Sequence, residues 1–408
     1  MQIRNQLVQT LLGFALVFLL VCAPVGAANV KLEFSGWSDN LIGAIIERFN
    51  REHPNIEIEN IPGNDSQVLV RMVAGTGPDI YHVSWANFGS FVQNGLALDI
   101  TELFDRDREE IQPEDIFPPA LNAFQYGDKL FAMPHHLGGN LMYLNLDRFN
   151  IAGIPEPSWN WTWNDLAVMA GKLTLDTNGD GTVDVWGLAN PSAWMFWASV
   201  IHSNGGKVYD KEEYKFYIDT DITRAAMRYL YDLANVFKGA PGPGIRPNGL
   251  RVWQAGTTGM VMAPATDDWQ QVGYNFAVLP NPQGSAGTAM MGSAQPLAIN
   301  PNCAHIEEAW TFLKWINRPD IQVWITNELQ LFPPTRRSVV RTIKNPYMIV
   351  FGQQLENQVA YTDRMHNVIP SVFNLYMDKA IRNEMSIPEA AMNIQHELTV
   401  KLEEDLKK

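Results

Sequence analysis

The sequence predicts an α/β fold in which helices cover a parallel sheet, and three observations lead to this class. Strand-like and helix-like segments alternate over residues 30–83. The segments between the strands carry apolar residues at helical spacing, and the last third of the chain is mostly helical. Strand, helix, strand, helix, strand is the pattern of a parallel α/β layer. With 408 residues, the chain is long enough for two domains or three.

The first layer follows directly from the order of its segments. His53-Pro54 ends its first helix, and a glycine- and proline-rich turn over residues 75–78 ends its second. The expected elements are a strand over 30–34, a helix over 41–49, a strand over 56–59, a helix over 68–72 and a strand over 79–83.

Later elements are indicated by caps and breakers. Thr162 and Asp165 have the spacing of a capping box at the start of a helix, with Asp in place of the usual Glu. Residues 239–244 alternate Gly with Ala or Pro and must form a loop. The other expected elements are strands over 183–188 and 277–279, and helices over 223–237, 307–316, 322–326, 372–381 and 388–406.

The composition excludes several classes of protein. The chain is 46% hydrophobic and 18% charged, as a globular protein is, and its 30 Gly and 25 Pro are close to ordinary usage. The formal net charge is −14. An acidic chain without a basic stripe repels a phosphate backbone, so we expect no nucleic-acid partner. Two cysteines cannot build a disulfide framework or a four-cysteine zinc site.

Residues 1–28 have the pattern of a cleaved secretory signal peptide. Arg4 precedes a short apolar run over residues 11–21, and small residues follow up to Ala28. This run is shorter than the ~20 apolar residues that span a membrane. We therefore expect an exported, periplasmic protein. Lipid anchoring through Cys22 is the alternative, but Val21 stands where lipoprotein signals usually have Gly, Ala or Ser.

Six short motifs together resemble one protein family. They are Ala-Gly-Thr-Gly-Pro-Asp-Ile at 74–80, Gly-Leu-Ala-Leu-Asp-Ile at 95–100, Tyr-Gly-Asp-Lys-Leu-Phe-Ala-Met-Pro at 126–134, Met-Tyr-Leu-Asn-Leu-Asp at 142–147, Gly-Thr-Thr-Gly-Met at 256–260 and Glu-Glu-Ala-Trp-Thr-Phe-Leu-Lys-Trp at 307–315. In this order and spacing, the chain resembles the extracellular solute-binding proteins of sugar-importing ABC transporters, the maltose-binding-protein-like group. The fourth motif departs from the Tyr-Tyr-Asn that is more common in the family.

The resemblance implies a periplasmic-binding-protein-like fold with two α/β lobes, a hinge and a ligand cleft between the lobes. By analogy, the N-terminal lobe comprises residues 29–137 plus 296–335, and the C-terminal lobe comprises residues 141–291 plus 340–408. The hinge crossings are then residues 138–140, 292–295 and 336–339. Open α/β sheets bind ligands beyond the carboxyl ends of their strands, which agrees with this arrangement.

Candidate ligand contacts follow two strands of the first layer. A sugar presents apolar C–H faces and a rim of hydroxyls, so its site needs flat aromatic rings and small polar side chains. Trp37, Ser38 and Asp39 follow the first strand, and Trp85 and Asn87 follow the third. The alternative is that the tryptophans pack within a lobe and that Ser38 or Asp39 caps the next helix.

The first crossing offers His135 and Asn140 as further ligand contacts. Gly138 and Gly139 between them can absorb backbone rotation and let the backbone approach a ligand. His135 and His136 suggest a metal site as an alternative, but no Asp, Glu or Cys cluster lies nearby at ligand spacing.

The expected second lobe supplies the other side of the site. Trp194 and Trp197 are three residues apart and share one face of a helix, and one of them is expected to pack within the lobe. The family also places an aromatic residue and polar side chains at the cleft where Asp267 and Trp269 occur. Asn374, on a late helix, is a further carry-over from the family. Trp159, Trp161 and Trp163 alternate beside prolines and are expected to be structural.

Residues 176–184 match the first part of a calcium-binding EF-hand loop. Oxygen-bearing side chains stand at relative positions 1, 3, 5 and 9, and a glycine stands at position 6. Position 12 is Gly187, where the bidentate Glu should be, so the alternative is a polar surface turn. The expected structural Ca²⁺ ligands are Asp176, Asn178, Asp180, Asp184 and the carbonyl of Thr182.

The sequence therefore predicts a monomeric receptor that carries a sugar to an ABC permease and needs no cofactor for this role. A receptor for a non-sugar solute, such as a glycerophosphodiester or polyol, is the first alternative, but a phosphate calls for Arg or Lys beside these loops. A secreted glycoside-active enzyme is a remote alternative, with Asp39 and Asp267 as its carboxylate pair. The sequence contains no phosphate-binding loop, no His-Glu-x-x-His and no Gly-x-Ser-x-Gly motif.

Overall fold

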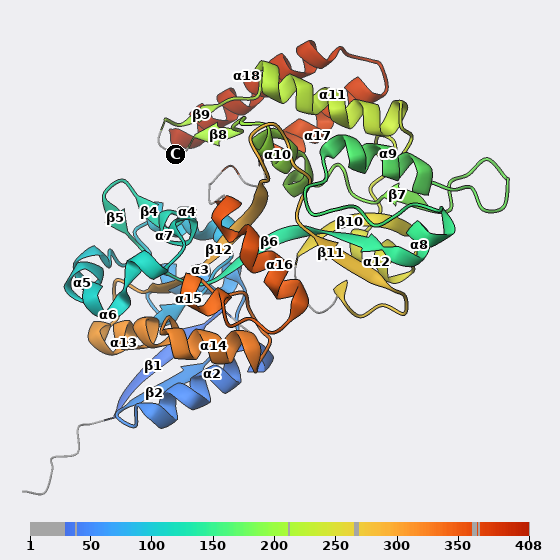
Figure 1. Ribbon diagram of the computed structural model, residues 1–408. Coiled ribbons are helices and arrows are strands. Elements are labelled where there is room, and N and C mark those ends of the chain that lie inside the picture. Colours follow the sequence, from blue (N-terminus) through green and yellow to red (C-terminus); the bar gives the residue numbers. More distant parts are fainter. Residues whose placement is uncertain are drawn as a thin grey trace, which may run out of the picture.

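The structure is a computed structural model that describes residues 29–36, 39–210, 213–264, 269–360, 365 and 368–407. The expected signal peptide, including Cys22, lies outside these residues. No helix within them combines the length and the apolar character that a membrane span requires. The chain forms two halves that are connected by long strands (Figure 1).

A mixed sheet runs through the described part of both halves. Its order is β2-β1-β3-β12-β6-β10-β7, with β11 also paired to β6 and β13 to β12. The strands are β1 (Val30–Ser35), β2 (Ile56–Asn60), β3 (Ile80–Tyr81), β6 (Met133–Asn145), β7 (Trp186–Leu188), β10 (Thr258–Pro264), β11 (Phe276–Leu279), β12 (Met290–Ile299) and β13 (Gln358–Ala360). Two small hairpins lie apart from it, β4 (Gln125–Tyr126) with β5 (Lys129–Leu130), and β8 (Tyr209–Asp210) with β9 (Lys215–Phe216).

The first half is the predicted parallel layer. β1 pairs in parallel with both β2 and β3, and Phe34 lies opposite Ile80 in the register. Phe49 packs edge-on against Phe312 and Trp315, which joins the N-terminal layer to a segment from the last third of the chain. The helices of this half are α2 (Asp39–Glu52), α3 (Asp65–Val73), α4 (Trp85–Gln93), α5 (Thr101–Arg106), α6 (Arg108–Ile111), η1 (Pro113–Asp115), α7 (Pro118–Asn122), α13 (Ile306–Ile316) and α14 (Pro319–Asn327).

The second half is built on the far end of β6. β10 and β11 pair antiparallel with it, and β7 pairs in parallel with β10. Helices surround this sheet, and α11 and α18 pack against each other and against α17. The helices are α8 (Leu146–Ile151), α9 (Trp163–Leu173), α10 (Trp194–Ser203), α11 (Asp221–Asn235), α12 (Gly249–Gln254), α17 (Val368–Ile381) and α18 (Ile387–Leu406).

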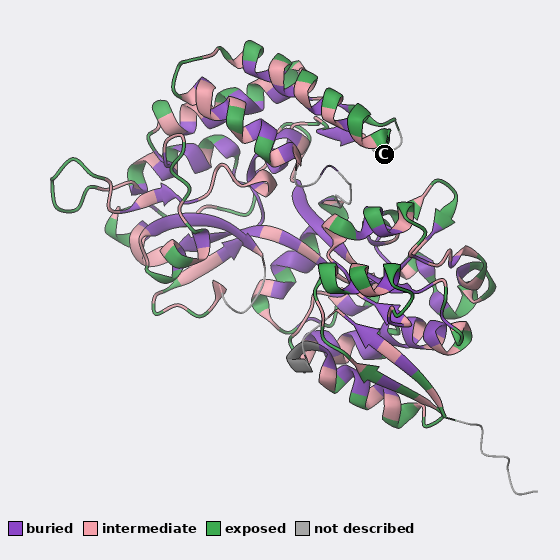
Figure 2. Cartoon of the chain, turned by 180° about the vertical axis from the view of Figure 1, so that it is seen from behind, coloured by how far each residue is buried: buried purple, intermediate pink, exposed green. Residues whose placement is uncertain are grey.

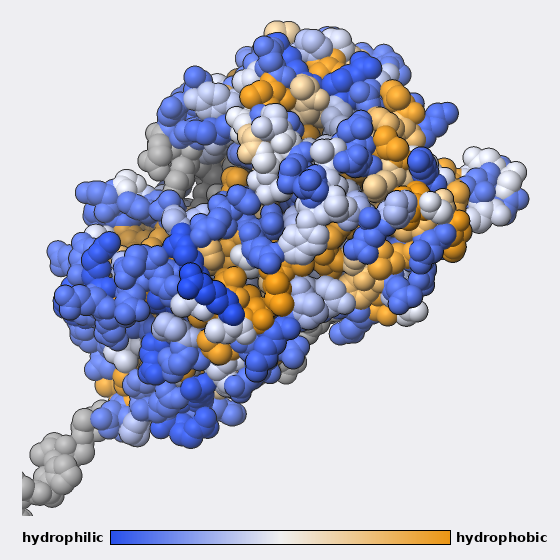
Figure 3. Space-filling model, in the orientation of Figure 1, coloured by the Kyte–Doolittle hydropathy of each residue, from blue (hydrophilic) through white to orange (hydrophobic). Residues whose placement is uncertain are grey.

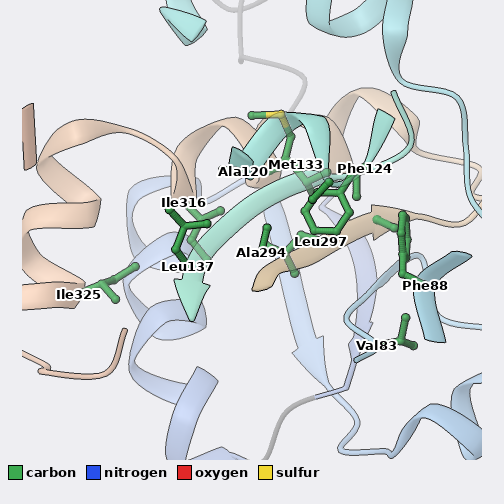
Figure 4. Packing of buried hydrophobic residues seen from close by; sticks show 14 of the residues in the cluster. Val83, Phe88, Ala120, Phe124, Met133, Leu137, Ala294, Leu297, Ile316 and Ile325 are labelled. Atoms are coloured by element: carbon green, nitrogen blue, oxygen red, sulfur yellow. The ribbon is translucent and has the colours of Figure 1, made fainter. Parts of the chain in front are cut away.

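β6 and β12 are the strands that connect the halves. Residues 133–139 of β6 pair antiparallel with β12, whereas residues 140–145 pair with β10 and β11. Both strands are buried along most of their length, and Figure 2 shows them as mainly purple bands, interrupted by pink, through the middle of the molecule. Met133 and Leu137 of β6 pack with Ala294 and Leu297 of β12 at the centre of the core (Figure 4).

A third segment lies across the same strands. It contains α15 (Arg337–Val340), α16 (Pro346–Gln354) and η3 (Leu355–Asn357), and it leads into β13. Tyr347 of α16 stacks on Phe276 of β11, with ring centroids 4.9 Å apart. Hydrophobic side chains gather over this middle region of the surface, while the surface of the first half is mostly hydrophilic (Figure 3). The stacking of Tyr347 joins α16 to a strand of the second half, and the assignment of residues 340–408 to the C-terminal lobe stays a prediction.

The predicted elements occur in the predicted order, with differences at their ends. The capping box at Thr162 is present, because Asp165 Oδ2 accepts the backbone N–H of Thr162 at 2.8 Å and Thr162 Oγ1 accepts that of Asp165 at 3.2 Å. β7 begins at Trp186 rather than 183, because residues 183–184 still belong to the polar loop and Val185 pairs with Leu175 in an isolated bridge. Trp161 and Trp163 are buried and donate their indole N–H groups to Pro280 O and Ser203 Oγ, as expected of structural residues.

Candidate ligand-binding site

Two tryptophans, one from each half, meet at the junction between the halves. Trp85 is the first residue of α4, and Trp194 is the first residue of α10. Their ring centroids lie 6.1 Å apart and their planes are tilted by 37°. Both side chains are half-buried. The separation lies within the range of an aromatic contact, so the two rings touch in this structure.

The position of Trp85 is set by the start of its helix. Ser84 is the N-cap of α4, and its hydroxyl accepts the N–H of Ala86 at 3.3 Å. The N–H of Ser84 is directed to both carboxylate oxygens of Asp65, at 3.0 Å each. Asn87 is exposed, and its Nδ2 donates to Asp65 Oδ2 at 2.6 Å. Asn87 was predicted to contact ligand, but in this structure its side-chain amide donates a hydrogen bond to Asp65.

The face of α10 explains why its two tryptophans differ. Trp197 is 0% exposed and stacks on Phe373 of α17, with ring centroids 3.9 Å apart and planes 10° from parallel. Phe196 also points into the core. Trp197 therefore has no surface with which to contact a ligand here, which corrects its inclusion among the predicted contacts. Trp194 is the member of the pair that reaches the junction.

Three histidines lie close together where the halves join. The ring of His135 is 5.4 Å from that of His82 and 4.3 Å from that of His136. His82 shares a hydrogen bond of 3.2 Å with Gln295 of β12, and His136 stacks on Phe332 at 4.2 Å. Burial lowers the pKa of His82 to about 4 and those of His135 and His136 well below the usual value. All three are therefore neutral at neutral pH.

His135 has a different role from the one the sequence suggested. Its side chain is only 3% exposed and lies among aromatic neighbours within the crossing. A sugar hydroxyl cannot approach a ring in this position without moving the surrounding strands. We therefore describe His135 as a core residue of the crossing, which corrects its place among the predicted contacts.

The crossing glycines lie in close packing with neighbouring side chains. A Cβ atom on Gly139 would lie 2.9 Å from Met290 Sδ and 3.0 Å from its Cε. Gly138 and Gly139 both belong to the extended strand β6, and neither has a positive φ. The expected hinge rotation at these glycines stays a prediction. Asn140, next along the strand, is half-buried, and its carbonyl accepts Nδ2 of the buried Asn281 at 3.1 Å.

For the other residues predicted to contact ligand, the observed interactions are with neighbours other than Trp85. Trp269 lies 6.2 Å from the ring of Tyr143 and its carbonyl accepts the indole N–H of Trp253. Asn374 lines a separate small hollow beside Ser192 and the Arg246–Asp378 ion pair. Asp39 is the first residue of α2. Trp37, Ser38 and Asp267 lie outside the described residues.

The acidic loop of residues 176–184 forms a series of tight polar turns. Asp176 accepts the N–H groups of Gly179 and Gly181 at 2.7 and 2.8 Å, and both glycines have positive φ. Asn178 accepts Asp180 N, and Asp180 accepts Thr182 N. Asp184 turns toward Thr177, whose hydrogen bonds lower the pKa of that carboxyl.

The expected metal ligands are not drawn together by this geometry. Within the described part of the chain, no three His, Cys, Asp or Glu side chains form a group suited to a metal ion. The oxygens of the loop accept backbone N–H groups instead. Calcium binding at this loop stays a prediction.

Two residues of this region were not found by sequence reasoning. Asp65 is the first residue of α3 and resembles an ordinary acidic residue of a helix start. His82 follows β3 in the structure but fell inside the longer strand predicted over 79–83, so it lacked the position after a strand that singled out Trp85. Position after a strand therefore predicted the right region but not all of its members.

The comparisons with known proteins agree with this architecture. Residues 36–323 match the sequence model of the family described as bacterial extracellular solute-binding protein. An arabinooligosaccharide-binding protein of Bacillus subtilis is 27% identical over 222 residues, which are 52% of this chain and 48% of that protein. The sn-glycerol-3-phosphate-binding periplasmic protein of Escherichia coli is 26% identical over 165 residues, 38% of this chain and 37% of that one.

A solved structure extends the likeness over nearly the whole chain. An ABC substrate-binding protein from Listeria monocytogenes in complex with cycloalternan has a TM-score of 0.77 and 18% identity, and the match covers 92% of this chain and 99% of that chain. At this identity the likeness concerns the fold. The matches to the arabinooligosaccharide-binding relatives span about half of those proteins' length. The fold is thus a two-lobed, periplasmic-binding-protein-like α/β fold.

Proposed function

This chain belongs to the bacterial extracellular solute-binding protein family, and we propose that it is the substrate-binding component of an ABC importer for an oligosaccharide. It takes up its ligand between the two halves and delivers it, unchanged, to the permease subunits in the membrane. We place it outside the cytoplasm, in the periplasm, as a monomer. The lobe and hinge boundaries of the sequence analysis belong to this proposal.

The observation that carries the proposal is the pairing of Trp85 with Trp194 across the junction. Indole rings are large, flat and apolar, with one polar edge, so they suit the C–H faces of a sugar ring. One ring comes from each half, so a ligand that contacts both is held by both halves. In this structure the rings contact each other, and an entering sugar ring must take the place of that contact.

The proposed nature of the ligand follows from the lack of cationic residues in the segments next to these rings. The segments 84–87, 138–140 and 191–194 contain no Lys or Arg. A phosphate group would require such cations in these positions. The arabinooligosaccharide-binding relative therefore offers a closer chemical parallel than the sn-glycerol-3-phosphate-binding relative, whose ligand carries a phosphate.

Cleavage of the ligand is not part of the proposal. Glycoside hydrolysis needs two carboxylates on either side of the scissile bond. Asp65, the carboxylate beside Trp85, has both oxygens occupied by the N–H of Ser84 and the amide of Asn87. A carboxylate held in this way stabilises the protein rather than attacking a sugar.

The proposal is tested by calorimetric titration with arabino- and malto-oligosaccharides and with sn-glycerol 3-phosphate. We expect one oligosaccharide to bind with a stoichiometry of one per chain, and mass spectrometry to recover it intact. If only sn-glycerol 3-phosphate binds, the proposal of an oligosaccharide ligand is wrong and the ligand is a phosphorylated one. Recovery of a shortened sugar would show that the protein cleaves its ligand and is an enzyme.

A further inference from the structure

We propose that Asp65 is a positioning residue for Trp85, which it orients from a neighbouring helix without contacting the ligand. The inference deepens the proposed function, because it assigns a new residue to the same site. Asp65 lies in the first turn of α3, and Trp85 begins α4. Asp65 is connected to the start of α4 through the N–H of the N-cap Ser84, which is directed to both carboxylate oxygens, and through the side-chain amide of Asn87.

The contacts of Asp65 join it to the backbone that carries Trp85. Its Oδ1 and Oδ2 both accept the N–H of Ser84 at 3.0 Å, and Oδ2 also accepts Asn87 Nδ2 at 2.6 Å. Ser84 directly precedes Trp85, and Asn87 lies two residues after it. The carboxylate therefore holds the residues on both sides of the tryptophan, and the direction of the Trp85 side chain follows from that backbone.

Electrostatics favour an acidic group at this place. The first N–H groups of a helix have no partner within the helix and carry a partial positive charge. α4 is a nine-residue helix, and its N-cap Ser84 satisfies the N–H of Ala86. Asp65 adds a full negative charge beside the same helix start. Hydrogen bonds to an ionised carboxylate are stronger than those between neutral groups.

The support for Asp65 itself is rigid. Asn64 and Gln67 form a reciprocal capping box at the start of α3, with hydrogen bonds of 3.0 and 2.9 Å. Asp65 is half-buried, directly after this cap. A fixed carboxylate can fix its partner, whereas a mobile one cannot. The orientation of Trp85 toward Trp194 is therefore set from α3.

This arrangement also gives Asn87 a different role. Its Nδ2 group is directed to Asp65, so the side chain supports α4 from the outside. Asp65 and Asn87 together form one brace around Trp85. Removing either partner should loosen the ring, and removing Asp65 should do so more, because it also releases the N–H of Ser84.

The first test needs no ligand and measures the contact between the two indoles. Rings this close give a coupled circular-dichroism signal, which is isolated as the difference between the wild type and Trp85→Phe. We expect Asp65→Ala to lose most of this signal, and Asp65→Asn and Asn87→Ala to lose part of it. Thr220→Ala is the matched control, because it removes the N-cap of α11 and lowers stability but leaves α3, Asp65 and α4 unchanged. Wild-type signal in both Asp65→Asn and Asn87→Ala would overturn the proposal.

The second test uses arabinotriose and maltotriose, whichever the wild type binds, in a double-mutant cycle. Asp65→Ala should weaken binding about tenfold in the wild-type background, which corresponds to about 1.4 kcal/mol. It should have little effect in the Trp85→Ala background, because the ring that Asp65 positions is absent there. An equal loss in both backgrounds would mean that Asp65 does not act through Trp85. If the wild type binds neither sugar, the proposed function fails, while the circular-dichroism test still decides the role of Asp65.

Discussion

Trp85 and Trp194 bring indole rings to within 6.1 Å of each other from helices that belong to different halves of the molecule. Each begins its helix, and each helix follows a loop at the junction. Because of this contact, the geometry of the binding site depends on how the two halves are oriented relative to each other. A ligand that replaces this contact must therefore affect both halves at once.

We expect such a ligand to shift the halves toward a closed arrangement. A ligand held by both halves binds the closed state better than the open one, and its differential affinity moves the population. A shift from 1% to 99% closed requires about 5.5 kcal/mol, which ring contacts and several hydrogen bonds can supply. Small-angle scattering with saturating oligosaccharide should give a smaller radius of gyration. Superimposable curves would instead indicate a preformed site.

The packing around β12 should not tolerate a side chain at Gly292 of this strand. A Cβ there would overlap the side-chain amide of Gln358 and the carbonyl of Gly138, which are themselves joined by a hydrogen bond of 2.7 Å. Gly292→Ala should lower the free energy of unfolding by about 1–3 kcal/mol, the usual cost of overpacking. Denaturant unfolding measures the effect.

A glycine with open surroundings provides the control for that experiment. Gly43 lies within α2, and a Cβ there would meet nothing within 4 Å. Gly43→Ala should raise stability by about 0.5–1 kcal/mol, because alanine is the better helix former. If Gly292→Ala were as stable as Gly43→Ala, the strands of the crossing would be less tightly packed than described.

Stability should fall as the pH falls below 6.5. His82 has a pKa near 6.5 when unfolded and about 4 when folded, because burial disfavours its charged form, and Gln295 and Asp65 only partly oppose this. Above pH 6.5 both states are neutral and contribute nothing. Between pH 6.5 and 4 the unfolded state binds a proton that the folded state does not, so stability decreases. His135 and His136 act in the same direction.

Thermal unfolding over this pH range tests the prediction. His82→Gln retains a polar group toward Gln295 and removes one titrating ring, so it should lose less stability than the wild type on acidification. His396→Gln removes an exposed histidine of α18 and should leave the profile unchanged. Parallel profiles for the wild type and His82→Gln would show that the crossing does not govern acid stability.

The loop of residues 176–184 gives a prediction for calcium. If Ca²⁺ binds the folded loop, calcium should raise the melting temperature and a chelator should lower it, because a ligand of the native state stabilises that state. Oligosaccharide affinity should change little. Asp180→Ala should abolish the calcium effect, and Asp221→Asn, an exposed aspartate of α11, should retain it. A melting temperature indifferent to both calcium and chelator would leave the loop as a polar turn.

The sequence predicted the elements well, because their signals are local. The capping box at Thr162 and the apolar spacing of the helices depend only on neighbouring residues. The family resemblance then placed those elements in two halves. The start of β7 was mispredicted, because residues 183–184 still belong to the polar loop and Val185 pairs only with Leu175 in an isolated bridge.

The candidate site was predictable only in part, because its members are sorted by contacts distant in the chain. Trp194 and Trp197 have the same local signal, and only the packing of Phe373 against Trp197 separates them. Asn87 has the chemistry of a ligand contact, but its partner Asp65 comes from another helix. No local pattern contains that information.

The most direct test of the account is calorimetric titration of the wild type, Trp85→Ala and Trp194→Ala with the oligosaccharide that the wild type binds best. Each substitution removes an aromatic surface that only one half contributes, and each should weaken binding by about 1–3 kcal/mol while the fold is retained. Trp159→Ala, in which a half-exposed tryptophan elsewhere is removed, is the control and should bind like the wild type. Wild-type affinity in both junction variants, with intact folds, would show that the ligand is not held between Trp85 and Trp194.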